Sequence, residues 1–261
     1  MNRKLAFAFY VNSEYYDMIN NIHFGCIERF SNCFDEASIN FILDKDYNRD
    51  YLLDAEQRFA KIFLGKKISF DIYDNTEYRE CLIFRDKVAN NLKNEDLVFF
   101  AHNKGTTNVK KYNREQIYTW VTAMYYYSLN YMDEVVQQLY SQKYYSYGPF
   151  LTKNEEKEKA NKYGWYYIGT YFWINCKKLW QYMQNEGIPV PEMGDRFYAE
   201  EFLGNIIQTW PYIMAGSHET RYLTNCYDYY NHATEYLSYL YETETDGFND
   251  FYKEITNEAS V

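Results

Sequence analysis

The residues best suited to bind a phosphate group lie in one short segment, His102-Asn103-Lys104-Gly105-Thr106-Thr107. Gly105 permits a sharp turn with exposed backbone N–H groups, and the hydroxyl of Thr106 follows it. His102 and Lys104 are two residues apart, so an extended chain places both side chains on one face. Lys104 adds a compact positive charge, and this combination suits a phosphate or diphosphate. The alternative is an exposed polar loop with an incidental lysine, because the sequence has neither G-x-x-x-x-G-K-[ST] nor G-x-G-x-x-G.

The adjacent acids Glu200 and Glu201 form the second candidate. They precede the apolar pair Phe202-Leu203, and on a helix only one of two neighbouring side chains faces a given cleft. A carboxylate held over a sugar-sized pocket can act as general base toward an acceptor hydroxyl. The alternative is structural, because acids in the first turn of a helix interact favourably with its dipole.

Two pairs of aspartates have the spacing of a weak metal motif, Asp44 with Asp46 and Asp71 with Asp74. Carboxylates at a strand end can bind Mg²⁺ or Mn²⁺ through oxygen, but solvated turn residues explain the same pattern. The histidines outside the His102 turn are isolated, and G-x-S-x-G is absent from the sequence. Neither a zinc site nor a serine hydrolase is therefore expected.

The first hundred residues predict the scaffold that positions these groups. Buried strands are expected at 4–11, 39–43, 68–73 and 96–101, and amphipathic helices at 14–34, 51–64 and 77–92. Such alternation predicts an α/β fold of the Rossmann type, with a mixed, mostly parallel sheet flanked by helices. Ligands of these sheets bind at the carboxyl ends of the strands. Those ends are all polar here: Asn12-Ser13, Asp44-Lys45-Asp46, Asp71 to Asn75, and His102 to Gly105.

The second half of the chain is predicted to be mainly helical. Helices are expected at 113–142, 177–185, 198–209 and 229–242. The aromatic segment 163–175 is interrupted by glycine, which predicts two short strands that turn at Gly169. A loose acidic tail is expected from Glu242 onward. The simplest division is one domain over 1–210 and a helical C-terminal extension with an acidic tail over 211–261.

The composition of the 261 residues excludes several classes of protein. Aromatic residues make up 21% of the chain, too many for an acidic disordered segment. A formal net charge of −10 argues against a nucleic-acid-binding protein, which needs a surplus of Lys and Arg. Five scattered cysteines without a C-x-x-C pair indicate reduced thiols, and no apolar run approaches the ~20 residues that span a bilayer. We therefore expect a cytoplasmic protein, with attachment at a membrane surface as the alternative; the oligomeric state stays open.

Four segments keep a fixed order across about residues 97–204. The turn His102-Asn103-Lys104-Gly105 is similar to H-[TS]-K-G, and a helix with Trp120 and Met124 follows it. Gly169 to Trp173 is similar to a G-N-F-W-W block, and Arg196 to Gly204 is similar to R-[YF]-x-A-E-x-[WF]-[IL]-G. In this combination the chain resembles a bacterial and viral family of glycosyltransferases involved in surface polysaccharides.

The resemblance implies a GT-A-like fold for nucleotide-diphospho-sugars, and it assigns roles to residues. Glu200 matches the family's acid and is the expected general base. Lys104, with His102, is expected to neutralise the leaving nucleoside diphosphate, with Gly105 and Thr106 as further donor contacts. In typical GT-A enzymes this slot carries an Asp-x-Asp that holds a divalent metal. Its replacement here puts a requirement for Mn²⁺ or Mg²⁺ in doubt.

Further substrate contacts follow from the same resemblance. Arg196 is expected to pair with the catalytic acid or to touch phosphate. Tyr171 and Trp173 either stack on sugar faces or pack in the core. Asn12 and Asp71 lie at strand ends where such a fold holds the nucleoside.

The expected reaction is transfer of a sugar from a nucleotide-diphospho-sugar donor to a glycan, lipid-linked or protein-linked acceptor. Two departures from the family pattern, Thr170 for Asn and Phe172 for Trp, change the contacts in the aromatic block. The alternative is a non-catalytic module that binds carbohydrate or nucleotide, in which Glu200 is only structural. The sequence leaves the donor sugar, its base, the acceptor and the stereochemistry open.

Overall fold

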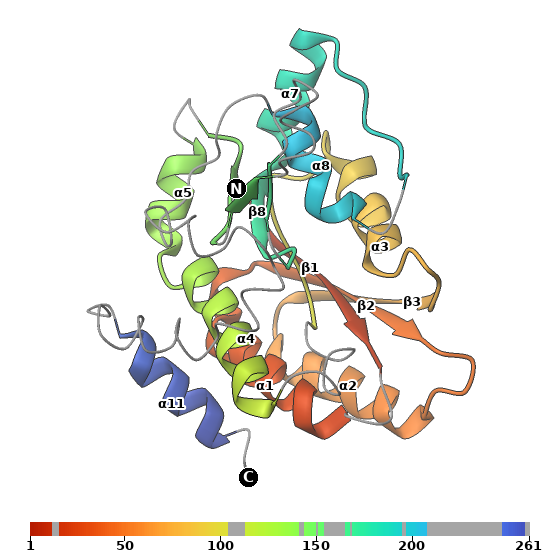
Figure 1. Cartoon of the computed structure of the whole chain (residues 1–261), viewed down its shortest axis with the longest axis vertical. Coiled ribbons are helices and arrows are strands. Elements are labelled where there is room, and N and C mark those ends of the chain that lie inside the picture. The colour runs from red at the N-terminus through yellow and green to blue at the C-terminus, as the bar shows by residue number, and fades with distance from the viewer. Residues whose placement is uncertain are drawn as a thin grey trace.

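The computed structural model describes residues 1–11, 16–103, 113–140, 144–149, 151–153, 165–167, 169–194, 197–207 and 247–258. Its centre is a six-stranded sheet with the strand order β3-β2-β1-β4-β8-β5 (Figure 1). The strands are β1 (Arg3–Tyr10), β2 (Glu36–Leu43), β3 (Lys67–Asp74), β4 (Leu97–His102), β5 (Ser146–Tyr147) and β8 (Phe172–Asn175). The strands β1 to β4 pair in parallel with one another, whereas β8 runs antiparallel to both β4 and β5. A separate two-stranded sheet joins β6 (Leu151–Lys153) to β7 (Trp165–Tyr167).

Helices cover both faces of the large sheet (Figure 1). They are α1 (Tyr16–Arg29), α2 (Arg49–Ile62), α3 (Glu80–Lys87), α4 (Arg114–Leu129), α5 (Met132–Tyr140), α7 (Cys176–Glu186), α8 (Tyr198–Ile206) and α11 (Phe248–Glu258). Short 3₁₀ turns lie at Ser31–Cys33 and Ala89–Asn91. The predicted α/β Rossmann-type fold, mostly parallel and with a helical C-terminal region, is confirmed. No described helix is long and apolar enough to cross a membrane.

The central strand β1 explains how the two faces are packed. Leu5, Phe7 and Phe9 point into the core shared with α1, α2 and α4, where burial of each large side chain contributes about 1.5–3 kcal/mol. Ala6 and Ala8 point to the opposite face and belong to the core of α3, α7 and α8. Since the alanines take little space, the helices on that face can approach the sheet closely. This brings α3 and α8 over the centre of the sheet.

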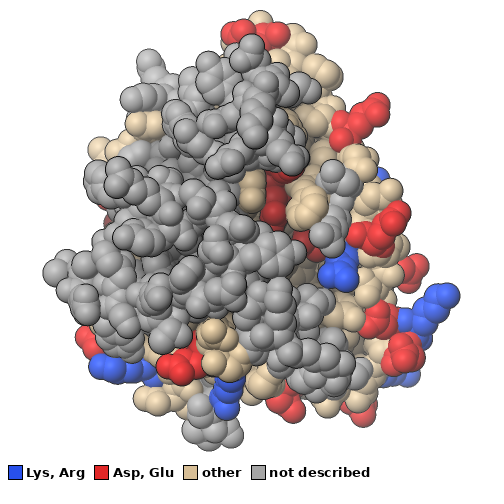
Figure 2. All heavy atoms as spheres, viewed as in Figure 1, with Lys and Arg blue, Asp and Glu red and all other residues tan. Residues whose placement is uncertain are grey.

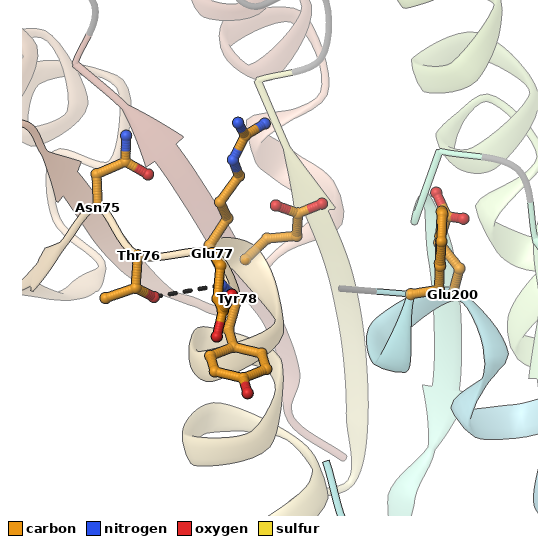
Figure 3. Close-up of a pocket in the computed structure, with 8 residues that line it drawn as sticks. Asn75, Thr76, Glu77, Tyr78 and Glu200 are labelled. Carbon is orange, nitrogen blue, oxygen red and sulfur yellow. Dashed lines mark hydrogen bonds between the residues drawn. The ribbon is translucent and has the colours of Figure 1, made fainter. Parts of the chain in front are cut away.

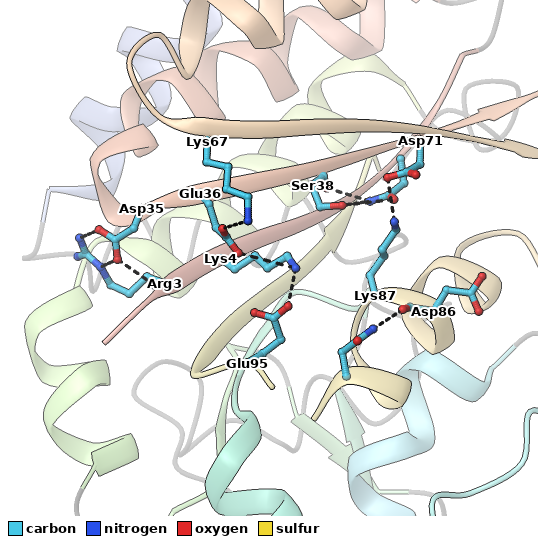
Figure 4. A network of polar contacts seen from close by, with 12 residues as sticks. Arg3, Lys4, Asp35, Glu36, Ser38, Lys67, Asp71, Asp86, Lys87 and Glu95 are labelled. Atoms are coloured by element: carbon cyan, nitrogen blue, oxygen red, sulfur yellow. Dashed lines mark hydrogen bonds and ion pairs between the residues drawn. The ribbon is translucent and has the colours of Figure 1, made fainter. Parts of the chain in front are cut away.

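Ion pairs occupy the amino ends of the strands, away from the predicted site (Figure 4). Arg3 pairs with Asp35 at 2.9 Å, and Lys4 pairs with Glu95 at 2.6 Å. Lys67 at the start of β3 reaches Glu36 at 3.2 Å. These pairs join neighbouring strands at their amino ends. The polar groups at the carboxyl ends of the strands form the candidate site.

Two helical predictions need correction. The helix expected over 113–142 is two helices, because α4 ends at Leu129 with Asn130 as its C-cap and α5 starts again at Met132. The loose acidic tail expected from Glu242 is wrong for α11, whose apolar side chains pack in the main core beside α1 and α4. The helix expected at 229–242 lies outside the described residues.

The apolar spacing of α11 explains why it is ordered. Phe248, Phe251 and Ile255 fall three and four residues apart and are all buried. The Phe251 ring contacts the rings of Phe30 and Tyr126, at 5.2 and 5.3 Å between centroids. The acids between these anchors face outward, and they dominate the composition of the segment.

The aromatic segment forms two strands, as expected, with the turn at Gly169. The strands join different sheets, however, since β7 pairs with β6 whereas β8 pairs with β4 and β5. Gly169 has a φ of +84°, a region that side chains of L-residues rarely adopt. The turn therefore separates the two strands rather than closing a hairpin.

Candidate functional site

The carboxyl ends of the parallel strands meet at one edge of the sheet and are joined there by side chains. The hydroxyl of Tyr10, at the end of β1, donates to the carboxylate of Asp44, which follows β2. The amide of Asn75, which follows β3, donates to the other oxygen of Asp44 at 2.7 Å. Asp44 thus accepts hydrogen bonds from both neighbouring strand ends. In the described part of the chain no three acidic, histidine or cysteine side chains are grouped as metal ligands.

Asn103 fixes the end of β4 against β1. Its side-chain oxygen accepts from the Tyr10 N–H at 2.7 Å, and its amide donates to the Tyr10 carbonyl and to Asn20 Oδ1, both at 2.9 Å. The backbone N–H of Asn103 also donates to Ala8 at 3.1 Å. The side chain is only 3% exposed. Asn103 therefore sets where the chain leaves the sheet, immediately before the basic turn.

His102 is the last residue of β4 and is held by the aromatic segment. His102 Nδ1 lies 2.6 Å from the hydroxyl oxygen of Thr170. That hydroxyl donates its one hydrogen to the Gly169 carbonyl at 2.7 Å, so we assign the imidazole hydrogen to Nδ1, which donates to Thr170. Tyr171 adds a second contact by donating from its hydroxyl to the His102 carbonyl.

A cavity of about 490 Å³ lies beside these strand ends, between the loop after β3 and the start of α8 (Figure 3). Its volume falls within the range of small-molecule sites. The described residues that line it are Asn75, Thr76, Glu77, Tyr78, Arg79, Glu80, Phe197 and Glu200. Three of them are carboxylates and one is a guanidinium, so the cavity has a negative balance. Figure 2 shows a hollow on the face of the molecule that is in view, with atoms of Asp and Glu residues inside it.

Glu200 reaches the cavity from the first turn of α8. The helix is anchored on its other side by Tyr198 and Phe202, whose rings contact Phe84 of α3 edge to face. In Figure 3 the Glu200 side chain stands across the cavity from Asn75 and Thr76. Glu201 is not among the residues that line it. The prediction that only one of the two acids faces a cleft is confirmed.

Glu80 connects the cavity to His102. It begins α3, lines the cavity, and places Oε1 at 3.9 Å from His102 Nδ1. The preceding residue, Arg79, has a φ of +39°, which costs a non-glycine residue about 1–3 kcal/mol. Strain of this kind in an otherwise regular segment is concentrated at functional sites. The strained turn lets Arg79 and Glu80 both face the cavity.

Five of the residues predicted for the site, Asn12, Lys104, Gly105, Thr106 and Arg196, lie outside the described part of the chain. They remain predictions.

Tyr171 and Trp173 are fully buried in the main core. The Trp173 ring packs against Phe34 and Phe99, and its N–H donates to the Ser128 carbonyl at 3.0 Å. This matches the core-packing alternative and leaves no ring face exposed for a sugar.

Asp71 lies within β3 rather than at its end. Its carboxylate pairs with Lys87 of α3 at 2.8 Å (Figure 4). With 42% of its side chain exposed, Asp71 stays accessible on the edge strand. The pair ties β3 to α3, the element that carries Glu80.

Six residues of the cavity were not predicted from the sequence: Thr76, Glu77, Tyr78, Arg79, Glu80 and Phe197. The segment from Glu77 to Glu80 was expected to lie inside a helix, whereas α3 begins only at Glu80. Phe197 was considered only as part of a motif, although it precedes Glu200 by three residues. The sequence signal for the residues that follow Asn75 is their position: polar side chains directly after β3 lie at the carboxyl end of the sheet.

The protein thus has a Rossmann-like α/β fold, with a cavity of ligand size at the carboxyl ends of its parallel strands.

No protein-family model matches the chain, and no curated protein matches it either. Among solved structures the chain is similar to the 4-diphosphocytidyl-2C-methyl-D-erythritol synthase of Anaerococcus prevotii. The identity is 12% and the TM-score is 0.41, over 91% of this chain and 99% of that chain. A similarity at this level carries no argument about activity.

Proposed function

We propose that this protein is a glycosyltransferase that moves a sugar from a nucleotide-diphospho-sugar to a glycan, lipid-linked or protein-linked acceptor. The observation that supports the proposal is the position of Glu200, which lines a cavity at the carboxyl ends of the strands together with Glu80, the residue that lies 3.9 Å from His102. General bases act on hydroxyls held in such cavities.

The contacts between the motif segments support the same proposal. His102 of the first segment bonds to Thr170 of the third. A Cβ at Gly169 would lie 3.0 Å from Met124 Cε and 3.2 Å from Trp120 Cζ2, so the second and third segments are also in contact. Three of the four segments are thus linked by direct contacts.

The proposed reaction needs no group beyond substrate and side chains. Glu200 accepts the proton of the acceptor hydroxyl, and that oxygen forms a bond to the anomeric carbon of the donor sugar. The bond between the anomeric carbon and the diphosphate oxygen breaks, and its electron pair leaves with the nucleoside diphosphate. Lys104, with Gly105 and Thr106, is the proposed group that stabilises this anion, since a positive charge placed where negative charge develops lowers the barrier.

The remaining roles are also proposals. Arg196 is close in sequence to α8 and supplies a second positive charge toward phosphate. Asn12, which follows β1 in the sequence, and Asp71, which lies within β3, are the proposed nucleoside contacts. His102 positions the turn through its two contacts to Thr170 and Tyr171. Under this proposal Mn²⁺ and Mg²⁺ are dispensable, because Lys104 provides the charge that a metal supplies elsewhere.

A screen of UDP-, GDP- and dTDP-sugars tests the proposal without knowledge of the acceptor. At least one donor is expected to raise the thermal midpoint, since a ligand at 100 times its Kd stabilises the folded state by about 2.7 kcal/mol. The same donor should be hydrolysed slowly, with EDTA present and absent. If no nucleotide sugar stabilises the protein or is hydrolysed, the proposal is overturned.

Lys104→Ala separates the role of the basic turn from the overall charge of the protein. Donor hydrolysis is expected to fall by about 10²–10³-fold, the effect of removing one group that stabilises the transition-state charge. Lys93→Ala, which removes an exposed lysine far from the strand ends, is the matched control. Activity that disappears in EDTA and returns with Mn²⁺ would contradict the proposed role of Lys104.

A further inference from the structure

The cavity beside Glu200 combines an exposed aromatic ring with several carboxylates. Phe197 is 44% exposed although it is a large apolar side chain, and it lines the cavity. Glu77, Glu80 and Glu200 line the same space, with Arg79 as the one basic side chain among the described residues. In the described part of the chain, this is where an accessible aromatic side chain meets a concave acidic surface.

We infer that this cavity binds an uncharged sugar or an amino sugar, with Phe197 as the surface on which the ring stacks. The inference rests on the proposed function and deepens it, because the bound sugar is the acceptor whose hydroxyl Glu200 deprotonates. It also divides the site in two, with the diphosphate of the donor outside this cavity.

The chemistry of a sugar ring fits the lining on both counts. One face of the ring presents C–H groups, which pack on an aromatic side chain. Its hydroxyls donate hydrogen bonds, and carboxylates are the strongest acceptors among side chains. A volume of about 490 Å³ accommodates a small ligand of this kind.

The charge of the cavity decides which sugars it accepts. Among the described residues, a phosphate, sulfate or uronic acid placed here faces three carboxylates and one guanidinium, and like charges at close range repel most strongly where water is excluded. An ammonium group on the sugar is attracted by the same carboxylates. The cavity therefore selects neutral or cationic rings and repels the anionic part of the donor.

The position of Phe197 relative to Glu200 makes it the stacking side chain. Phe197 is the N-cap of α8, Glu200 lies in the first turn of that helix, and both line the cavity. The aromatic side chains predicted for this task, Tyr171 and Trp173, are 0% exposed. A ring held on Phe197 instead lies beside the carboxylate that takes the proton.

An array of defined synthetic oligosaccharides tests the inference. It should contain neutral, amino-sugar, sialylated, uronic-acid and sulfated structures, probed with the labelled full-length protein. Wild-type protein is expected to bind neutral or amino-sugar structures, and Phe197→Ala is expected to weaken that binding at least ten-fold. Phe197→Trp, which keeps an aromatic face, should retain it. Phe70→Ala is the matched control, because Phe70 is a similarly exposed phenylalanine on β3.

Charge selectivity is tested on the same array. Glu77→Lys is expected to weaken binding of amino sugars and to admit uronic-acid structures. Phe197→Leu keeps the apolar bulk without the aromatic face, so it replaces Phe197→Ala if the latter does not fold. Binding only to acidic structures, no binding to any structure, or unchanged binding after loss of the aromatic ring each overturns the inference.

The donor screen distinguishes this outcome from failure of the proposed function. Hydrolysis of a nucleotide sugar without binding of neutral or amino sugars leaves the transferase in place and overturns the assignment of the cavity. Binding of neutral sugars without binding or hydrolysis of any nucleotide sugar overturns the transferase, and the cavity is then a sugar site of a non-catalytic module.

Discussion

Gly169 is the position where a single methyl group most directly tests how the motif segments are packed. Its φ of +84° is unfavourable for any other residue, and an added Cβ would lie 3.0 Å from Met124 Cε and 3.2 Å from Trp120 Cζ2. Backbone strain of this type costs about 1–3 kcal/mol, and overpacking adds about 1–3 kcal/mol where neighbours cannot move. Because the end of the Met124 side chain can shift, we expect Gly169→Ala to destabilise the protein by about 3 kcal/mol, in the lower half of the combined range of about 2–6 kcal/mol.

Gly65 provides a control that separates the two contributions. Its φ is +81°, almost the same as that of Gly169, but nothing lies within 4 Å of an added Cβ. Gly65→Ala therefore carries the backbone cost alone. The free energy of unfolding, measured by urea titration with circular dichroism, should fall by at least 1 kcal/mol more for Gly169→Ala than for Gly65→Ala.

A thermal melt gives a second measure of the same difference. A loss of about 3 kcal/mol corresponds to a fall in Tm of about 6–12 °C for a protein of this size. Equal destabilisation by the two substitutions would refute the close contact between Gly169 and α4. In that case the packing of Gly169 against α4 would not explain how Thr170 is held beside His102.

Three further predictions concern stability and thiol chemistry. Burial raises the pKa of Cys26 and of Cys176, so iodoacetamide at pH 7.5 should leave both unmodified in the native protein and label them in urea, as read by peptide mapping; native labelling would contradict their burial. Asn103→Ala removes a buried amide that bonds to Tyr10 and Asn20, and urea titration should show a loss of about 2–3 kcal/mol, against a change within error if the clamp is unimportant. The side chain of Lys177 and the N–H of Asn2 lower the pKa of Asp96 below its unfolded value of about 3.9, so the pair stabilises the protein above that pH and the effect is lost as the pH falls through the folded-state pKa. Asp96→Asn should therefore lose less stability than wild type between pH 5 and pH 2, and parallel curves would contradict the assignment.

Much of the fold was predictable because the central strands are buried on both faces. β1 and β4 contain continuous apolar runs, β2 is buried although Ser38 and Asn40 interrupt its run, and such runs identify parallel strands under helices. The sequence did not predict the break between α4 and α5, because apolar residues at helical spacing continue on both sides of Asn130 and Tyr131. α11 was missed for the opposite reason, since acids surround its three apolar anchors. The pairing of β6 with β7 depends on contacts between distant segments and has no local signal.

The site was predictable only in part. The rule that ligands bind at the carboxyl ends of parallel strands predicted the end of the sheet beside which the cavity lies, and the helical geometry of the two adjacent acids indicated that one faces a cleft. Local sequence did not show whether an aromatic residue is buried or exposed. Tyr171 and Trp173 were therefore considered for sugar stacking, whereas Phe197 was not. Glu80 and Arg79 were missed because their role depends on where α3 begins.

The most direct test of the account compares Glu200→Gln with Glu201→Gln, two neighbouring substitutions of the same chemistry. Of these two side chains, only that of Glu200 lines the cavity. Once a donor has been identified, Glu200→Gln is expected to lower sugar transfer by about 10²–10⁴-fold, the usual contribution of a general base, while donor binding is retained. Glu201→Gln is expected to leave the rate within a factor of a few. Equal activity of Glu200→Gln and wild type, or an equal loss in both variants, would contradict Glu200 as the base.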